Sequence, residues 1–288
     1  MRKLLLVFLL VLFSANVALA DATVGEVVIT LGADLKKEQK DQMLGKFNAP
    51  NAKIITVTNA EEHKYLDGLL NKSIIGNHAI SCARIEMAPA GTGVVVETNN
   101  ISWVSKAMYE NSLATAGVKD ARVQVDAPFS VSGTAALTGV MKAFETATGE
   151  KLDENRKVVA NEELVTTAKI GDEIGDQEKA AELLTRLKAE LSKHAANLTD
   201  SQLQDMIINV STNMGLTLDQ SEIDALVSIL RKIQALDIDW NQVLNQVSSY
   251  KDEIQDFLNN NPETKSFLQE FLSFFQSLFE KAINWLKS

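Results

Sequence analysis

The chain has 288 residues, a formal net charge of −10 and a single cysteine. This length predicts about two domains of ~150 residues each, with room for two hydrophobic cores. The acidic balance excludes nucleic acid as an expected partner, because like charges repel the phosphate backbone. One cysteine excludes an intramolecular disulfide, and we expect Cys82 to be a small buried apolar residue.

Residues 1–20 have the pattern of a secretory signal peptide. A short basic start precedes an apolar run over residues 4–18, and residues 18–20 give the small-x-small pattern that signal peptidase cleaves. The apolar run is shorter than the roughly 20 residues of a membrane-spanning helix. The sequence therefore predicts a secreted or extracytoplasmic protein whose mature chain begins at Asp21. The absence of cysteine at that position argues against a lipoprotein anchor.

Residues 21–150 alternate short β-type runs with helical patterns. We expect strands over residues 27–30, 54–57, 79–87, 93–98 and 122–125, and helices over residues 34–47, 61–70, 102–115 and 132–148. Single strands separated by helices favour an α+β fold, a mixed α/β sandwich. The turn signal at residues 88–92 predicts a hairpin between the third and fourth strands, which makes the sheet partly antiparallel.

Particular side chains are expected to mark the ends of these elements. Asp34 and Asn59 are expected to cap the helices that follow them. Pro128 is expected to end the last strand, because proline lacks the backbone N–H of a strand. Gly117 and Gly149 are expected to end the helices that precede them.

After residue 150 the β-type pattern disappears, and the sequence predicts an all-α helical bundle domain over residues 151–288. The expected helices cover residues 154–174, 177–195 and segments that begin near residues 199, 217, 243 and 262. Two of these starts share Leu-Thr-x-x-Gln, at residues 198–202 and 216–220, which we interpret as repeated capping chemistry. This half is also the more acidic one, with 14 basic and 23 acidic residues.

The last expected helix has an unusual aromatic content. Apolar side chains that include Phe267, Phe271, Phe274 and Trp285 form a stripe along one face. We expect this helix to pack at the centre of the C-terminal bundle. A membrane-surface or partner-docking role is the alternative, but its polar face lacks the lysines and arginines that anionic membranes attract. Membrane contact is therefore not favoured.

Most known catalytic and metal-binding patterns are absent. The three histidines lie in separate segments, and there is no cysteine pair, no phosphate-binding glycine loop and no dinucleotide fingerprint. A calcium-type start at residues 237–241 lacks the glycine and glutamate that such a loop requires. We interpret the adjacent pairs Glu61–Glu62 and Glu162–Glu163 as solvated helix faces. The sequence therefore predicts no metal site, no cofactor and no catalytic residue.

One stretch is a candidate binding site: Ser130, Ser132, Gly133 and Thr134. A strand is expected to end here and a helix to begin, among small hydroxyl residues and glycine. Free N–H groups at a helix start can hold an anion or a carboxylate. In the alternative interpretation, Ser132 caps the helix and the small residues allow close packing on the sheet. A nucleophilic serine is not favoured, because no histidine or lysine nearby would activate it.

Several segments resemble a secreted, uncharacterised family of Gram-positive bacteria, the YpuA-like family. The best-matching piece is Val131-Ser132-Gly133-Thr134-Ala135-Ala136-Leu137-Thr138-Gly139, and further pieces are residues 31–35, 38–39, 80–81, 103–110 and 114–121. The resemblance covers most of the mature chain and implies a signal peptide, an extracytoplasmic location and a bacterial source. The family is one of unknown function, so it implies no catalytic residues.

Together these observations favour an exported, non-enzymatic protein that binds an unknown protein or an envelope polymer. One alternative is a secreted hydrolase or transferase of unfamiliar type, assembled from residues far apart in sequence. Another is a membrane-surface binder that uses the C-terminal amphipathic helix. Neither the ligand nor the oligomeric state follows from the sequence.

Overall fold

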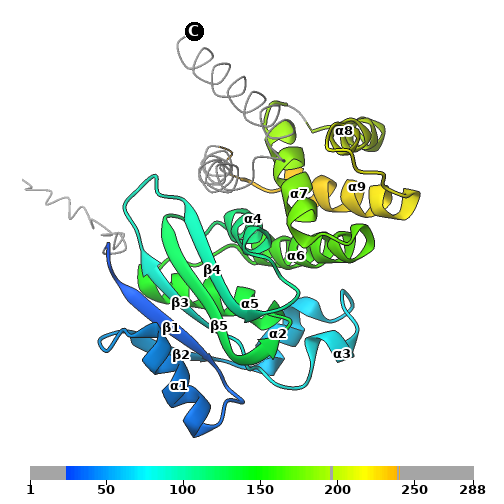
Figure 1. Ribbon diagram of the computed structural model, residues 1–288. Coiled ribbons are helices and arrows are strands. Elements are labelled where there is room, and N and C mark those ends of the chain that lie inside the picture. Colours follow the sequence, from blue (N-terminus) through cyan, green and yellow to red (C-terminus); the bar gives the residue numbers. More distant parts are fainter. Residues whose placement is uncertain (1–23, 195–196, 239, 241–288) are drawn as a thin grey trace, which may run out of the picture.

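Five strands form one mixed sheet in the computed structural model, which describes residues 24–194, 197–238 and 240 (Figure 1). The strands are β1 (Val27–Gly32), β2 (Lys53–Val57), β3 (Cys82–Met87), β4 (Val94–Ile101) and β5 (Ala121–Val131). Their spatial order is β2-β1-β3-β5-β4. The β1–β2 and β4–β5 pairs are parallel, and the β1–β3 and β3–β5 pairs are antiparallel. The expected mixed α/β fold with a partly antiparallel sheet is confirmed.

The expected hairpin between the third and fourth strands is wrong. β5 lies between β3 and β4, and α4 (Lys106–Ala116) connects β4 to the parallel β5. The loop between β3 and β4 forms hydrogen bonds with Asp120, the residue before β5. The Ala88 amide donates to the Asp120 carbonyl at 2.7 Å, and the Gly93 amide donates to the Asp120 carboxylate at 2.9 Å. The turn signal was therefore genuine, but the strand pairing is long-range.

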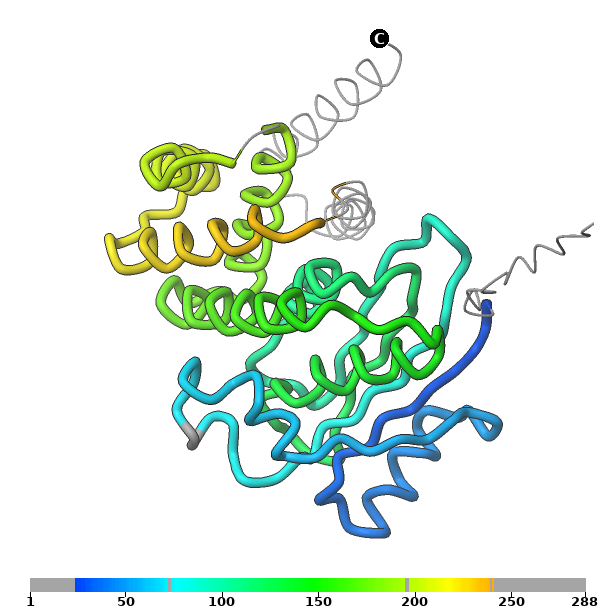
Figure 2. Tube along the Cα trace, turned by 180° about the vertical axis from the view of Figure 1, so that it is seen from behind, coloured from blue at the N-terminus to red at the C-terminus, as the bar shows by residue number. Residues whose placement is uncertain are grey.

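One face of the sheet is covered by α4 and α5 (Thr134–Thr148), as the view from behind shows (Figure 2). Inward-facing residues of the strands, such as Ile85 and Val123, meet Leu137 and Phe144 of α5 in one buried cluster. Gly139 permits this close approach. A Cβ atom at Gly139 would lie 2.8 Å from the Thr30 Oγ1 atom in β1.

The opposite face carries α1 (Lys37–Phe47). Met43 and Phe47 of this helix pack on Ile29 and Leu31 of β1. Cys82 belongs to the same cluster, and it is buried and unpaired, as the sequence predicted. Burial raises the pKa of its thiol to about 11, so the side chain is a neutral apolar residue at neutral pH.

The remaining helices are α2 (Asn59–Leu66), α3 (Lys72–Ile75), α6 (Glu154–Ile174), α7 (Gln177–Leu191), α8 (Asp200–Asn213) and α9 (Gln220–Gln234). α6 packs on α4, α7 and α9, and α8 packs on α7 and α9, to one side of the sheet (Figure 1). One cluster of buried apolar residues continues from the strands to α9. The boundary expected near residue 150, between an α/β domain at 21–150 and a helical domain at 151–288, stays a prediction.

Two expected helix caps differ from the structure. α1 begins at Lys37, and the Asp34 carboxylate instead accepts from the Ala79 amide at 2.8 Å, which ties the loop to the segment before β3. Asn59 is the first residue of α2, and the N-cap is Thr58, whose side chain and Glu61 form a capping box. Because neither residue is an N-cap, the side chains of Asp34 and Asn59 are available for tertiary contacts.

β5 continues through Pro128, so the prediction that this proline ends the strand is wrong. Pairing with β3 stops at Asp126, and the register with β4 shifts between Asn99 and Ile101. A proline is tolerated where a strand loses a neighbour or has a bulge, because no ladder hydrogen bond is lost there.

The capping chemistry of the helical half is partly as expected. Thr199 caps α8 in a capping box with Gln202. α9 also begins with a capping box, but it is formed by Asp219 and Glu222 rather than by Thr217. The glycine ends at Gly117 and Gly149 are confirmed, and both adopt left-handed backbone conformations. The signal segment 1–20 and the expected helices after residue 242 lie outside the described residues.

Candidate functional site

Residues 130–134 connect β5 directly to α5. Ser130 is exposed and Ser132 is half-buried, whereas Gly133 and Thr134 are buried. Phe129, just before this stretch, has 49 % of its surface exposed. The structure therefore splits the candidate residues into an outer pair, Ser130 and Ser132, and an inner pair that belongs to the interior.

Gly133 is the N-cap of α5, with a left-handed φ of 98°, and the helix start has no side-chain cap. The alternative in which Ser132 caps the helix is therefore wrong. The carbonyl oxygen of Gly133 accepts a hydrogen bond of 2.5 Å from the fully buried Tyr109 hydroxyl of α4. A Cβ atom here would lie 2.5 Å from both the Tyr109 hydroxyl and the Ile101 side chain. Only glycine fits this position.

A carboxylate of the protein itself lies at the start of α5. The Thr134 hydroxyl donates to the Glu62 carboxylate at 2.8 Å, and the Asn59 side chain donates to its other oxygen at 3.3 Å. Glu62 is 1 % exposed and comes from α2. A negative charge at this position interacts favourably with the positive end of the helix dipole. Glu62 therefore contacts the first turn of α5 through the Thr134 hydroxyl rather than as a cap of its backbone amides.

Burial raises the pKa of Glu62 to about 6, against the opposing effects of the hydrogen bonds from Thr134 and Asn59 and the charge of His63. The interpretation of Glu61 and Glu62 as one solvated face is therefore wrong for Glu62. Glu61 points elsewhere and pairs with Lys142 at 2.5 Å. Sequence reasoning missed Glu62, because only the packing of α2 on α5 distinguishes it from its neighbour.

The short helix α3 and the turn that follows it lie beside Ser132 and α2. The Ser132 hydroxyl donates to the Ile74 carbonyl at 3.5 Å and is 3.4 Å from the Thr134 hydroxyl. The His63 ring contacts the Asp67 carboxylate at 2.7 Å and the Gly76 carbonyl at 3.2 Å. A chain of hydroxyl groups therefore runs from the half-buried Ser132 through Thr134 to the buried Glu62.

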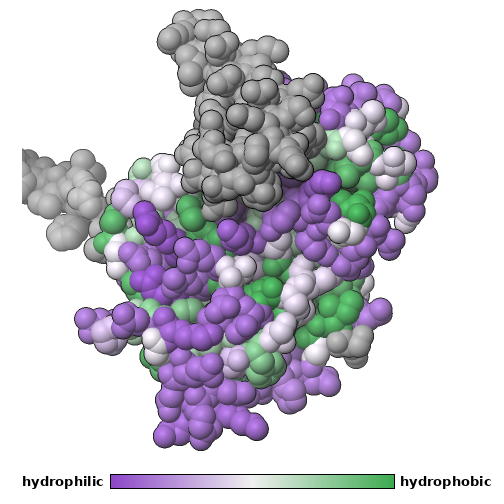
Figure 3. All heavy atoms as spheres, viewed as in Figure 1, coloured by the Kyte–Doolittle hydropathy of each residue, from purple (hydrophilic) through white to green (hydrophobic). Residues whose placement is uncertain are grey.

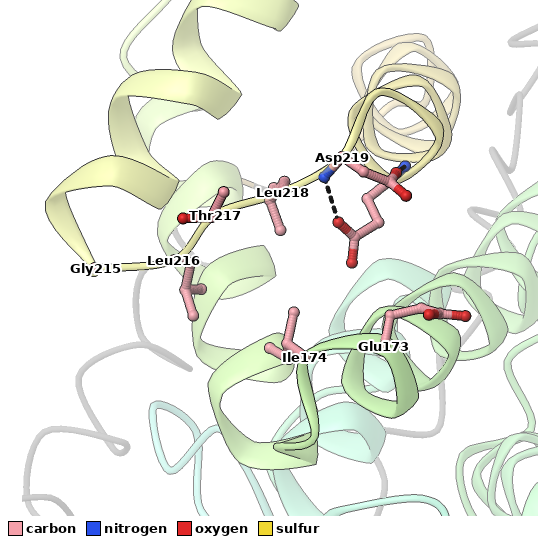
Figure 4. A pocket seen from close by; sticks show the side chains of 8 residues that line it. Glu173, Ile174, Gly215, Leu216, Thr217, Leu218 and Asp219 are labelled. Atoms are coloured by element: carbon pink, nitrogen blue, oxygen red, sulfur yellow. Dashed lines mark hydrogen bonds between the residues drawn. The ribbon is translucent and has the colours of Figure 1, made fainter.

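Two hollows lie elsewhere, along the loop between α8 and α9, and Figure 4 shows the one that Glu173 and Ile174 line. Their volumes are about 420 and 340 Å³, and both include residues 215–218. Ile174 of α6 and Leu218 of the loop line the larger one, where the Asp219 amide donates to the Glu222 carboxylate at 2.6 Å. The larger hollow adjoins the capping box of α9, and none of the four sequence-predicted site residues lines either hollow.

The described residues hold neither a metal-binding cluster nor a membrane-spanning helix. In residues 24–194, 197–238 and 240, no group of three or more His, Cys, Asp or Glu side chains has an arrangement that could hold a metal ion. No helix within the described ranges combines the length and the apolar character needed to cross a membrane.

Comparison with known proteins agrees with the resemblance in the sequence. A family model described as a protein of unknown function (DUF1002) matches residues 31–250. The uncharacterized protein YpuA of Bacillus subtilis (strain 168) is 44 % identical over 279 residues, which is 96 % of each chain. No solved structure matches this chain.

The chain has a mixed α/β fold in which an internal carboxylate lies at the start of a central helix. It belongs to the DUF1002 family of proteins of unknown function, and the expected YpuA-like membership is confirmed.

Proposed function

We propose that this protein is exported and binds a partner protein or an envelope polymer outside the cytoplasm. The first part of the proposal rests on the signal-peptide pattern of residues 1–20. The second part rests on the connection from β5 to α5, where Phe129 and Ser130 are exposed and the half-buried Ser132 contacts the carbonyl of the exposed Ile74, and which is named here the β5–α5 surface.

The β5–α5 surface combines exposed apolar side chains with hydroxyl groups. Phe129 is the only aromatic residue among the large apolar side chains that are most exposed in the described chain, and Ile74 is another member of that group. Other apolar residues on the face seen in Figure 3 form small patches among hydrophilic ones. Aromatic side chains with polar neighbours are enriched in binding interfaces. The exposed Phe129 is the observation that carries the proposal.

Binding is favoured over hydrolysis by the burial of the site. The hydroxyl that contacts the Glu62 carboxylate belongs to Thr134, which is 1 % exposed and thus inaccessible to a substrate. Ser132 is more accessible, but it reaches Glu62 only through Thr134. A general base must lie within hydrogen-bond reach of the nucleophile that it activates. The membrane-surface alternative depends on the C-terminal helix, outside the described residues.

Export predicts that the mature chain is found outside the cytoplasm and begins at Asp21. Fractionation of the native host, with mass analysis of the N-terminus, checks this expectation. Recovery in the wall or membrane fraction would support an envelope partner, and recovery as free soluble protein in the medium would weaken the binding proposal. A full-length chain confined to the cytoplasm would contradict export.

Phe129→Ala is expected to reduce capture of the partner by about tenfold or more, because a central aromatic residue contributes at least 1.4 kcal/mol to a typical interface. The measurement is retention of envelope components on the immobilised mature protein. Ile208→Ala is the matched control, since Ile208 is 41 % exposed but lies on α8. Equal retention by both variants and the unchanged protein would contradict binding at this surface.

A further inference from the structure

Two adjacent residues of α2 hold two different segments of the chain. Glu62 accepts from Thr134 at the start of α5, and His63 contacts the carbonyl of Gly76 in the turn after α3. Asn59 joins the two contacts, because its side-chain nitrogen is 3.3 Å from Glu62 and 3.4 Å from the Gly76 carbonyl. The carbonyl of Ile74, in α3 just before this turn, accepts from Ser132. Residues 59–76 therefore fasten the turn to the β5–α5 connection.

The described side chains around Glu62 do not neutralise its charge by an ion pair. The elements that pack on α2 carry basic groups, but these have other partners. Lys142 of α5 pairs with Glu61, Lys157 of α6 pairs with Glu145 and Glu154, and Lys169 of α6 donates to the Leu69 carbonyl. Tyr109 of α4 is also near, and its pKa is raised by burial and by the charge of Glu62. The ionised form of Glu62 is stabilised by the hydrogen bonds from Thr134 and Asn59, the dipole of α5 and the charge of His63, but these do not outweigh the cost of burying the charge.

Protonation of Glu62 removes this penalty without breaking the contact. A neutral carboxyl group can donate to the Thr134 hydroxyl, which can then donate to Ser132, and Ser132 to the Ile74 carbonyl. The half-buried Ser132 also gives the buried carboxyl a hydrogen-bonded path to solvent. Both protonation states of Glu62 thus keep the same hydrogen-bonded series of atoms, but the hydrogen-bonding groups are better satisfied in the neutral state.

His63 titrates in the same direction. Its pKa is raised, chiefly by the hydrogen bond with Asp67, with further contributions from the Gly76 carbonyl and from the charges of Asp67 and Glu62. The charged ring can donate to both partners at once, whereas the neutral ring has one N–H and can donate to only one of them. Deprotonation of His63 therefore loosens either the Asp67 contact or the contact with the turn.

We propose that residues 59–76 form a pH-responsive clamp over the start of α5, which Glu62 and His63 hold closed in acid and loosen as the pH rises. The pH window follows from the two groups. Glu62 binds its proton more tightly in the closed form than in the open form. The stability that this gives the closed form is lost as the pH rises from 4.5 to about 6. The contribution of His63 is complete below pH 6.5 and is lost as the pH rises through its raised pKa. The clamp requires no partner and is independent of the proposed binding function.

Hydrogen exchange of the full mature chain tests the clamp. Amide exchange in residues 67–76 and 132–136, divided by the intrinsic rate at each pH, is expected to be faster at about pH 8 than at about pH 5. A shift of the Glu62 pKa from 4.5 to about 6 corresponds to a change of about 30-fold in the opening equilibrium over the whole titration, of which about eightfold falls between pH 5 and pH 8, if opening exposes the carboxyl. Exchange in the strands is expected to change little.

Three variants show which residue causes each part of the pH response. Glu62→Gln keeps an acceptor for Thr134 and cannot ionise, so it is expected to remove the part of the pH response centred below pH 6. His63→Gln keeps a donor for the Gly76 carbonyl and is expected to remove the part above it. Glu61→Gln, on the same helix, is the matched control and is expected to retain the full response. A wild-type exchange ratio that is equal at both pH values, or a full response in both Glu62→Gln and His63→Gln, would overturn the proposal.

Discussion

Lys188→Met is expected to lower the free energy of unfolding by about 3–5 kcal/mol, because it leaves the buried Glu163 carboxylate without its counter-charge. Both side chains are 0 % exposed, and the Lys188 ammonium lies 2.9 Å from the Glu163 carboxylate. The ammonium also donates to the Thr115 hydroxyl at 2.8 Å and to the Asn111 carbonyl at 2.9 Å. Chemical denaturation at neutral pH measures the loss.

Burial alone disfavours both charges of this pair. It raises the pKa of Glu163 and lowers the pKa of Lys188, and each charge opposes the effect on its partner. The pair therefore links α4, α6 and α7 through mutual compensation rather than through a large net gain. Replacing both residues, Lys188→Met with Glu163→Leu, is expected to restore most of the stability that Lys188→Met removes.

A more exposed ion pair between α9 and α6 gives the control. Lys232 of α9 pairs with Glu162, the neighbour of Glu163, and both members are more exposed than the buried pair. Lys232→Met is expected to cost less than about 1 kcal/mol. A similar loss for Lys188→Met and Lys232→Met would contradict the assignment of Lys188 and Glu163 as a coupled buried pair.

The adjacent pairs Glu61–Glu62 and Glu162–Glu163 show which features could not be predicted from the sequence. The spacing of apolar residues and the caps predicted the helix over residues 154–174 and the start of the helix near residue 199 well, because both signals are local. The partners of Glu62 and Glu163 lie on other elements, Thr134 on α5 and Lys188 on α7. No local pattern distinguishes a buried carboxylate from its exposed neighbour one residue away.

The strand pairing failed for the same reason. The runs that became β3 and β4 were correctly placed, and a turn does lie between them. Their pairing depends on β5, which lies later in the chain and pairs with both strands. Local turn signals therefore located the strands but did not determine the order of the sheet.

Gly133→Ala is expected to lower the free energy of unfolding by about 3 kcal/mol or more. A φ of 98° costs a residue with a side chain on the order of 1–3 kcal/mol. The new methyl group would also lie 2.5 Å from the Tyr109 hydroxyl and from the Ile101 side chain. Moving Tyr109 leaves a fully buried hydroxyl without its acceptor, at about 1–3 kcal/mol. Thermal and chemical denaturation measure the loss.

Gly149→Ala, at the other end of α5, separates the two causes. Gly149 also has a left-handed φ, of 73°, but nothing lies within 4 Å of an added Cβ atom. This variant should show the backbone strain alone, so a loss as large as that of Gly133→Ala would contradict the role of the Tyr109 contact. Adding Tyr109→Phe to Gly133→Ala removes the clashing hydroxyl and should make the double variant less unstable than the sum of the two single losses. Gly133 therefore secures the fold beneath the β5–α5 surface, and substitutions that test binding there belong at Phe129 and Ser130, where the side chains face solvent.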